Sequence, residues 1–249
     1  MAVTLLSFNV RYSGLDTGDR AWERRRDAVA SVVARATPDV LCLQEVWRGQ
    51  LTDLRERLPD YAWVGRSVAG GEHTPVGYDA DRFALDDWGA FGLSETPEAP
   101  ERPGWDAALP RVTTWARLWD GDRSLTAVST HFDHEGERAR RESADLLADW
   151  VTDREEPVAL AGDLNCEPHD PPHARLVDEG PLADAGRTDG AASSVPTFTD
   201  FGGPDGGRRL DYVLLTDELR VERFDVLDAR PDGGYPSDHD PVVVDLAWR

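Results

Sequence analysis

Hydrophobic residues fall into short runs along the chain, and most of these runs have the length of a β-strand. Val3 to Val10 is an apolar, β-prone run and Val40 to Gln44 is a second, so both are predicted to be buried strands. Thr113 to Trp119 alternates between two kinds of side chain, which indicates a strand with one half-buried face. Further strands are predicted at Tyr61 to Val64, Val76 to Tyr78, Leu125 to Phe132, Val158 to Ala161, Leu210 to Leu215, Val221 to Val226 and Val242 to Leu246.

Three segments show helical spacing instead. The first runs from about Asp19 to Ala36, and Pro38 ends it because proline cannot continue a helix. A short amphipathic helix is predicted around Leu51 to Leu58, and a longer one at Gly136 to Thr152. Strands and helices alternate without a linker or repeat, so we expect a single α/β domain over residues 1–249.

The composition excludes several classes of protein. Hydrophobic residues make up 40% of the chain, which is enough for a core and excludes a wholly disordered protein. No apolar run approaches the roughly 18 residues of a membrane span, so no membrane partner is expected. The first residues lack the basic region and cleavage site of a signal peptide, and we therefore predict a cytoplasmic protein, expected to be a monomer.

The net charge of −21 is the most unusual feature of the composition. There are 48 acidic and 27 basic residues, and every basic residue is Arg. One interpretation is an acidic protein that repels nucleic acid and membranes. The interpretation we favour is adaptation to the salty cytoplasm of a halophile, where the Debye length is about 3 Å and local charge decides which partners bind.

Polar side chains stand at the ends of several predicted strands, where a sheet presents them to a shared crevice. Taken singly, an Asp-x-Asn after a strand is usually a turn, and a strand-end Glu or His is usually solvated. Six such places with compatible chemistry are harder to explain in this way, so we interpret them as one functional site. They are Asn9, Glu45, His131, the pair Asp163 and Asn165, Asp211, and the pair Asp238 and His239.

The motifs SFN, LQE, STH, GDLN, LDYVL and SDH follow one another along the chain. In this order the sequence resembles the endonuclease/exonuclease/phosphatase superfamily over essentially its whole length, and the stretch LSETPEAPERPGWDAALPRVTTWARL is similar to a prokaryotic, mostly uncharacterised branch. The resemblance implies a deoxyribonuclease-I-like fold, a four-layer α/β/β/α sandwich of two mixed β-sheets with outer helices. It also implies a site at one edge of the sheets that hydrolyses a phosphoester with Mg²⁺ or Mn²⁺.

The residue types fit this chemistry in their own right. Hard divalent cations take oxygen ligands, so Glu45 is the best candidate metal ligand, with Asn9 and Asp238 beside it. Hydrolysis also needs an in-line water that loses its proton. Asp163 is predicted to be the base or to orient that water, and Asn165 is predicted to hold the water or a phosphate oxygen.

Two histidines complete the predicted site. His239 is expected to bind the scissile phosphate, and Asp211 to accept its ring N–H and fix its tautomer. In secreted deoxyribonuclease and its relatives the His equivalent to His131 pairs with a Glu, and the resemblance places Glu72 in that role; a solvated loop Glu is the alternative. Arg111 aligns with an Arg that contacts substrate phosphate in some members. The alternative for Arg111 is a surface salt bridge, which the sequence supports equally well.

His134 and the connecting loops also lie near the motifs. If the strand that ends at His131 continues, alternation places His134 on the opposite face, so His134 is left out of the predicted site. Substrate specificity is expected to reside in the loops at about 66 to 75, 94 to 110, 168 to 175 and 200 to 209, because loops vary more than the strands that carry them.

The predicted function is a divalent-metal-dependent phosphodiesterase or nuclease whose substrate is a phosphoester, with nucleic acid among the candidates. The first alternative is a phosphatase for a small soluble phosphoester, which the acidic composition favours. A second alternative is a catalytically silent binding module on the same fold, although every expected site position is filled. The sequence lacks the lysine-rich loops of inositol phosphatases, the apolar hairpin of sphingomyelinases and the basic surface of abasic-site endonucleases.

Overall fold

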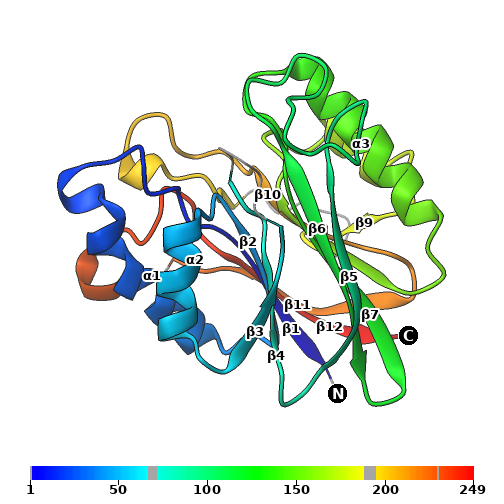
Figure 1. Cartoon of the computed structure of the whole chain (residues 1–249), viewed down its shortest axis with the longest axis horizontal. Helices are drawn as coiled ribbons and strands as arrows, with labels where there is room; N and C mark the ends of the chain where they lie inside the picture. The colour runs from blue at the N-terminus through cyan, green and yellow to red at the C-terminus, as the bar shows by residue number, and fades with distance from the viewer. Residues whose placement is uncertain (1, 67–71, 188–194, 229) are drawn as a thin grey trace.

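Two β-sheets pack face to face in the computed structural model, which describes residues 2–66, 72–187, 195–228 and 230–249 (Figure 1). The first sheet has the order β11-β12-β1-β2-β4-β3 and the second β5-β6-β7-β8-β10-β9. The first contains β1 (Val3–Asn9), β2 (Val40–Gln44), β3 (Tyr61–Val64), β4 (Val76–Asp79), β11 (Leu219–Val226) and β12 (Val242–Trp248). The second contains β5 (Ala84–Gly92), β6 (Val112–Asp120), β7 (Arg123–His131), β8 (Val158–Asp163), β9 (Ala183–Asp184) and β10 (Asp211–Leu215).

Helices cover the outer face of each sheet. Both α1 (Trp22–Ala36) and α2 (Arg48–Arg57) pack on the first sheet, and α3 (Glu137–Thr152) and α4 (Pro171–Val177) on the second. Short 3₁₀ turns, η1 (Gly18–Arg20), η3 (Asp200–Gly202) and η4 (Pro231–Gly233), lie in the connections. Each sheet combines parallel and antiparallel pairs, so the predicted four-layer sandwich of mixed sheets is confirmed.

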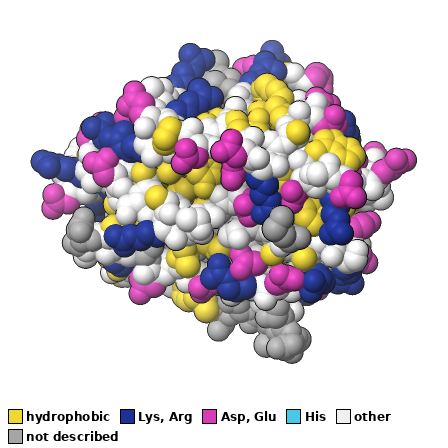
Figure 2. Space-filling view, turned by 90° about the horizontal axis from the view of Figure 1, so that it is seen from below, with side chains coloured by type: hydrophobic (Ala, Val, Ile, Leu, Met, Phe, Trp, Pro, Cys, Tyr) yellow, Lys and Arg dark blue, Asp and Glu magenta, His cyan; other side chains and the backbone are white. Residues whose placement is uncertain are grey.

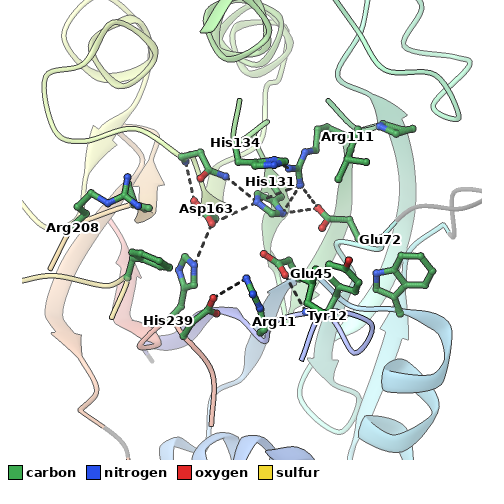
Figure 3. Close-up of a pocket in the computed structure, with 18 residues that line it drawn as sticks. Arg11, Tyr12, Glu45, Glu72, Arg111, His131, His134, Asp163, Arg208 and His239 are labelled. Atoms are coloured by element: carbon green, nitrogen blue, oxygen red, sulfur yellow. Dashed lines mark hydrogen bonds and ion pairs between the residues drawn. The ribbon is translucent and has the colours of Figure 1, made fainter. Parts of the chain in front are cut away.

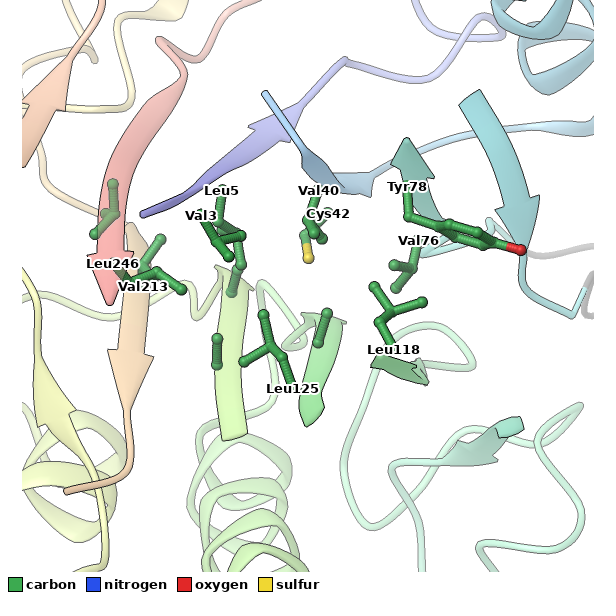
Figure 4. Packing of buried hydrophobic residues seen from close by; sticks show 14 of the residues in the cluster. Val3, Leu5, Val40, Cys42, Val76, Tyr78, Leu118, Leu125, Val213 and Leu246 are labelled. Atoms are coloured by element: carbon green, nitrogen blue, oxygen red, sulfur yellow. The ribbon is translucent and has the colours of Figure 1, made fainter. Parts of the chain in front are cut away.

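The core lies in three apolar layers, because each sheet buries both of its faces. The inner layer joins the two sheets through residues such as Leu5, Cys42 and Leu125 (Figure 4). One outer layer packs α1 and α2 on the first sheet, and the other packs α3 and α4 on the second. Burial on both faces explains why the central strands read as continuous apolar runs in the sequence.

The predicted elements agree with the structure except at three places. The missing elements are β5, β9 and α4. Most of β5 faces solvent at the edge of its sheet, so it carries no hydrophobic alternation to reveal it. The short helix α4 begins with two prolines, and the sequence predicts a loop over 168 to 175, where most of this helix lies.

Strand pairing brings the predicted site residues to one rim of the sandwich. In the first sheet β1 runs parallel to β2, with Asn9 opposite Gln44, so Glu45 follows directly beside Asn9. In the second sheet β7 runs parallel to β8, with His131 opposite Asp163, and antiparallel β10 starts at the same level. The carboxyl ends of parallel strands share an edge, and both sheets expose theirs on the same side.

Charges of both signs are interspersed on the face of the molecule in Figure 2, where no single-sign patch dominates. None of the described helices combines the length and the apolar character needed to cross a membrane.

Candidate active site

A pocket of about 560 Å³ opens at the rim where these strands end (Figure 3). Such a volume lies within the range of small-molecule sites. Two predicted residues, Asn9 and Asp211, do not line it but hydrogen-bond to residues that do. The structure therefore brings all ten predicted site residues together, and those that line the pocket are Glu45, Glu72, Arg111, His131, Asp163, Asn165, Asp238 and His239.

The backbone is strained where the strands end at this pocket. Arg11, Glu45 and Asn165 have φ values of 57°, 58° and 46°, a left-handed conformation that non-glycine residues seldom adopt. Such strain gathers at functional sites, where the surrounding fold enforces it. In the GDLN motif, a Cβ on Gly162 would collide with the carbonyl oxygen of Thr130 on the neighbouring strand, so glycine is required there.

Asn9 links the two sheets at the centre of the site. Its Nδ2 donates to Glu45 Oε1 at 3.0 Å and to Asp163 Oδ2 at 3.1 Å, while its Oδ1 accepts from the amide of Arg11 at 3.0 Å. Glu45 Oε2 accepts from the amide of Tyr12 at 3.0 Å. Asn9 thus positions both carboxylates. If Asn9 also bound a metal ion, its Oδ1 would have to coordinate the ion while accepting the N–H of Arg11.

Asp238 lines the same pocket and forms an ion pair. Its Oδ2 is 3.0 Å from Nη1 of Arg11, a residue not singled out from the sequence. Burial, and then the negative charge of Glu45, raise the pKa of Asp238 despite this ion pair. The Asp238 carboxyl group is therefore harder to ionise than an ordinary Asp.

His239 sits between two carboxylates. Its Nδ1 donates to Asp211 Oδ2 at 2.8 Å, as predicted for a carboxylate that fixes the tautomer, and its Nε2 lies 3.7 Å from Asp163 Oδ2. Burial opposes the charged ring, but Asp211 and Asp163 outweigh it and raise the pKa of His239 to about 10. Burial and the adjacent Asp211 also raise the pKa of Asp163. The two carboxylates therefore favour the protonated form of the His239 imidazole.

His131 belongs to a denser network. Its Nδ1 lies 2.6 Å from Glu72 Oε1, the pairing implied by the family resemblance, and its Nε2 lies 3.0 Å from the amide nitrogen of Asn165. Burial alone would raise the pKa of Glu72, but His131 and Arg111 lower it to about 2. The His131 pKa is raised, because Glu72 outweighs both burial and the repulsion of Arg111.

Arg111 is buried, with 4% of its side chain exposed, and four side chains surround its guanidinium. It donates to Glu72 Oε1 at 2.9 Å and to Asp133 Oδ2 at 3.3 Å, and it lies 2.9 Å from the Nδ1 atoms of both His131 and His134. These contacts favour a positioning role. The predicted contact with substrate phosphate stays a prediction.

The pocket therefore has two halves with different charge balance. The balanced half consists of Glu72, Asp133, Arg111 and His131, in which two carboxylates face one guanidinium and one imidazole. The acidic half consists of Glu45, Asp163, Asp211 and Asp238 with Arg11 and His239, in which four carboxylates face one guanidinium and one imidazole.

The acidic half fits a divalent cation. Asp211 Oδ1 is buried and has no hydrogen-bond partner among the described residues. Asp163, Asp211 and His239 each offer a ligand atom within 4.8 Å of the others, and Glu45 and Asp238 present hard oxygen donors to the same pocket. Oxygen-rich, negatively charged surroundings of this kind are those that Mg²⁺ and Mn²⁺ prefer.

Several pocket residues were not found from the sequence. His134 lines the pocket because β7 ends at His131, so the assumption that the strand continues was wrong. Arg11 lies two residues after the SFN motif, and this position could have identified it as a site residue. The others come from connecting segments whose packing the sequence pattern does not reveal, and they are Tyr12, Leu15, Trp47, Leu109, Pro110, Phe198, Arg208 and Leu210.

Comparisons with known proteins agree with this geometry. A family model described as Endonuclease/Exonuclease/phosphatase family matches residues 6–239. The solved structure of an endonuclease/exonuclease/phosphatase from Bacteroides vulgatus is 30% identical and covers 100% of both chains with a TM-score of 0.92. A mannosyl-6-phosphatase from Bacteroides thetaiotaomicron is 30% identical, with a TM-score of 0.88 over 99% of this chain and 100% of that one.

A viral relative is more distant. An uncharacterized protein from Acanthamoeba polyphaga mimivirus is 25% identical over 162 residues, which span 59% of this chain and 60% of the viral protein. The family resemblance drawn from the six motifs is confirmed by the family model and the Bacteroides structures.

Proposed function

Because the chain belongs to the endonuclease/exonuclease/phosphatase family, we propose that it is a divalent-metal-dependent phosphoester hydrolase that uses in-line attack by water. The observation that carries this proposal is the meeting of Glu45, Asp163 and His239, from both sheets, in one pocket. Each supplies a different requirement of the reaction: a hard cation ligand, a carboxylate for the water and a positive group for the phosphate.

Glu45 and Asp238 would hold the cation, and Arg11 on Asp238 neutralises part of their charge. The bound ion would supply charge neutralisation at the phosphoryl oxygens. Glu45 is held for this role by the hydrogen bonds from Asn9 and Tyr12, one to each carboxylate oxygen. Its free lone pairs face the pocket.

Asp163 would take the proton of the attacking water. Its raised pKa, caused by burial and Asp211, makes it a stronger base than an ordinary Asp. Asn165 lies two residues on, and its backbone N–H donates to Asp163 Oδ1 at 2.9 Å, which fixes the two side chains relative to each other. The Nδ2 of Asn165 lies 3.0 Å from His131 Nε2 and donates to the carbonyl of Phe132 at 3.0 Å, so Asn165 would hold the water beside the base through its side-chain oxygen.

His239 would bind the scissile phosphate in its protonated form. Asp211 stabilises the imidazolium from Nδ1 and leaves Nε2–H directed at the site, so positive charge is in place before the reaction begins. In the balanced half, Glu72 and Arg111 hold His131, and His131 in turn contacts Asn165. We assign that half to positioning.

Among the substrates, we propose a small soluble phosphomonoester of the sugar-phosphate class ahead of nucleic acid. The pocket volume of about 560 Å³ suits a small molecule. The net charge of −21 disfavours a polyanion at low salt, and the 30% identity to a mannosyl-6-phosphatase over nearly both whole chains supports the same choice. Nuclease activity, the class predicted from the sequence, is tested alongside.

The experiment is an activity screen on purified protein. Phosphate release is measured from hexose phosphates, nucleoside monophosphates and p-nitrophenyl phosphate, and strand cleavage from single- and double-stranded DNA and RNA. Each reaction is run with Mg²⁺, with Mn²⁺ and with a chelator, at low and at multimolar salt. Asp163→Asn serves as the inactive control and the exposed Asp145→Asn as its matched active control.

The expected result is metal-dependent phosphate release from hexose phosphates that disappears in Asp163→Asn and persists in Asp145→Asn. Cleavage of DNA or RNA without phosphate release would replace the phosphatase proposal with a nuclease. Hydrolysis that survives both the chelator and Asp163→Asn would refute the mechanism.

A further inference from the structure

The wall of the pocket next to Glu45 is apolar, although 30% of the chain is charged. The rings of Tyr12 and Trp47 stack there, with centroids 5.5 Å apart and planes at 27°. Among the described residues only five large hydrophobic side chains are exposed, and two of them, Leu15 at 49% and Leu109 at 48%, line this same pocket. Exposed apolar groups that gather at one pocket mark a binding surface.

The stacked pair, which we call the Tyr12–Trp47 platform, is held in place from behind. Gln50 is fully buried, and its Oε1 accepts from the amides of Ser13 at 3.0 Å and Trp47 at 3.2 Å. Its Nε2 donates to the carbonyl of Arg11 at 3.0 Å. One side-chain amide thus fixes both segments that carry the rings relative to each other.

Gly14 gives the Tyr12 ring its position. A Cβ on residue 14 would lie 2.8 Å from Cε2 of that ring, closer than packed atoms allow. The Tyr12 ring therefore packs against Gly14 and also stacks on Trp47. Both ring residues remain partly exposed, so the platform offers an apolar face to whatever enters the pocket.

The Tyr12–Trp47 platform lies directly beside Glu45, a proposed cation ligand. The amide of Tyr12 donates to Glu45 Oε2 at 3.0 Å, so the ring follows immediately after a residue that we assign to the cation. Figure 3 shows Tyr12 next to Glu45 and across the pocket from Arg208. A group attached to the ester oxygen of a phosphate held by His239 and the cation would meet this wall first.

Resting on the proposed hydrolase function, we infer that the Tyr12–Trp47 platform binds the ring of a cyclic sugar phosphate and sets specificity for it. A sugar ring has an apolar C–H face that packs on aromatic rings and polar edges that suit the charged remainder of the pocket. In a hexose 6-phosphate the ring is joined to the phosphate only through C6 and O6, and the Tyr12 amide bound to Glu45 keeps the platform beside the cation ligand. The platform carries no group that takes part in the chemistry, so it acts through binding alone.

The test compares a hexose 6-phosphate with its reduced, open-chain hexitol 6-phosphate, which has the same phosphate and carbon chain but carries a C5 hydroxyl in place of the ring oxygen and has no ring. Turnover is measured for wild type, Tyr12→Leu, Tyr12→Phe and Trp47→Ala, with Trp88→Ala, an exposed Trp outside the pocket, as the matched control. Affinity for both compounds is measured by calorimetry in the Asp163→Asn background, so that the result does not depend on turnover.

Wild type is expected to prefer the cyclic compound. Tyr12→Leu and Trp47→Ala should lower kcat/KM for the hexose 6-phosphate roughly ten- to a hundredfold through KM, the range that stacking on an aromatic ring provides, and leave the hexitol 6-phosphate unchanged. Tyr12→Phe and Trp88→Ala should keep the preference. The calorimetric affinities should follow the same order.

Equal binding of the cyclic and open-chain compounds by Asp163→Asn protein would overturn the inference even if hydrolysis is confirmed. Equal losses on both compounds in Tyr12→Leu would do the same, because they would make the platform merely structural. An effect confined to DNA oligonucleotides would overturn the assignment to sugar. Failure of wild type to hydrolyse any phosphoester would instead refute the proposed function, while the ring preference in binding still decides the inference.

Discussion

The two halves of the pocket use similar residues to opposite effect. In the balanced half, against the effect of burial, His131 and then Arg111 lower the pKa of Glu72 to about 2. Against burial again, the backbone N–H groups of Gly136 and Ala108, and after them Arg111, lower the pKa of Asp133 to about 2. In the acidic half, Asp163 and Asp238 have raised pKa values, chiefly because of burial and then because of neighbouring carboxylates. The comparison teaches that the ion pairs of the balanced half stabilise the fold, whereas the acidic half needs a bound proton or cation to neutralise its excess negative charge.

The largest effect should come from neutralising the acidic half. Asp163→Asn is expected to lower kcat about a thousandfold, because the water loses its base. The same change should not lower the melting temperature of the metal-free protein, since the fold gains nothing from a carboxylate whose pKa it raises. Steady-state kinetics and calorimetry on the same sample check both points. A clear loss of stability would mean that the acidic half is structural.

The balanced half should respond in the opposite way. Glu72→Gln leaves the buried Arg111 short of a partner and should lower the free energy of unfolding by about 3 kcal/mol. Turnover should fall only about tenfold, because His131 still contacts Asn165. Urea unfolding and kinetics measure the two effects, with Glu135→Gln as control because that side chain is 71% exposed. Unchanged stability would contradict the assigned network.

Acid unfolding sharpens the same contrast. The Glu72 pKa is lowered from 4.5 to about 2, so the stability it contributes is present above about pH 4.5 and is lost as the pH falls toward 2. Wild-type stability should therefore fall more steeply over that window than the stability of Glu72→Gln, by roughly 3 kcal/mol in total. Parallel curves from pH 5 to pH 2 would show that Glu72 is not held ionised by its neighbours.

The smallest effect is expected at the edge of the balanced half. His134 contacts Arg111 but is 47% exposed, so His134→Ala removes one hydrogen bond that water can replace. Stability should fall by no more than about 1 kcal/mol and turnover by a few-fold. Losses as large as those of Glu72→Gln would move His134 into the centre of the network.

The sequence was a good guide wherever a side chain sits at the end of a buried strand. Such strands have continuous apolar runs, and their parallel pairing fixes which ends meet, so Asn9, His131 and Asp163 could be placed together. The need of a catalytic histidine for a carboxylate that fixes its tautomer suggested the pairing of His239 with Asp211, and the two side chains lie 2.8 Å apart in the structure. The edge strand β5 was missed because its exposed residues show no periodicity.

The sequence was a poor guide to the walls of the pocket. Tyr12 and Trp47 lie in the segments that follow β1 and β2. Their stacking depends on the lack of a side chain at Gly14 and on the buried Gln50, and neither has a sequence signal. The loops at 66 to 75, 94 to 110 and 200 to 209 contribute Glu72, Leu109 and Arg208 to the pocket, with residues 67–71 outside the described part of the chain. That these loops set specificity stays a prediction. None of the pocket residues comes from 168 to 175 within the described chain.

The central claim is that the acidic half, and not the balanced half, holds the cation on which hydrolysis depends. The most direct measurement is phosphate release from metal-stripped protein as Mn²⁺ is added back, for wild type, Glu45→Gln and Glu72→Gln. We predict no turnover before addition, a saturable return in wild type, at least about a tenfold higher Mn²⁺ requirement in Glu45→Gln, and an unchanged requirement with a lower plateau in Glu72→Gln. Full turnover without metal, or equal shifts in the two variants, would contradict the account.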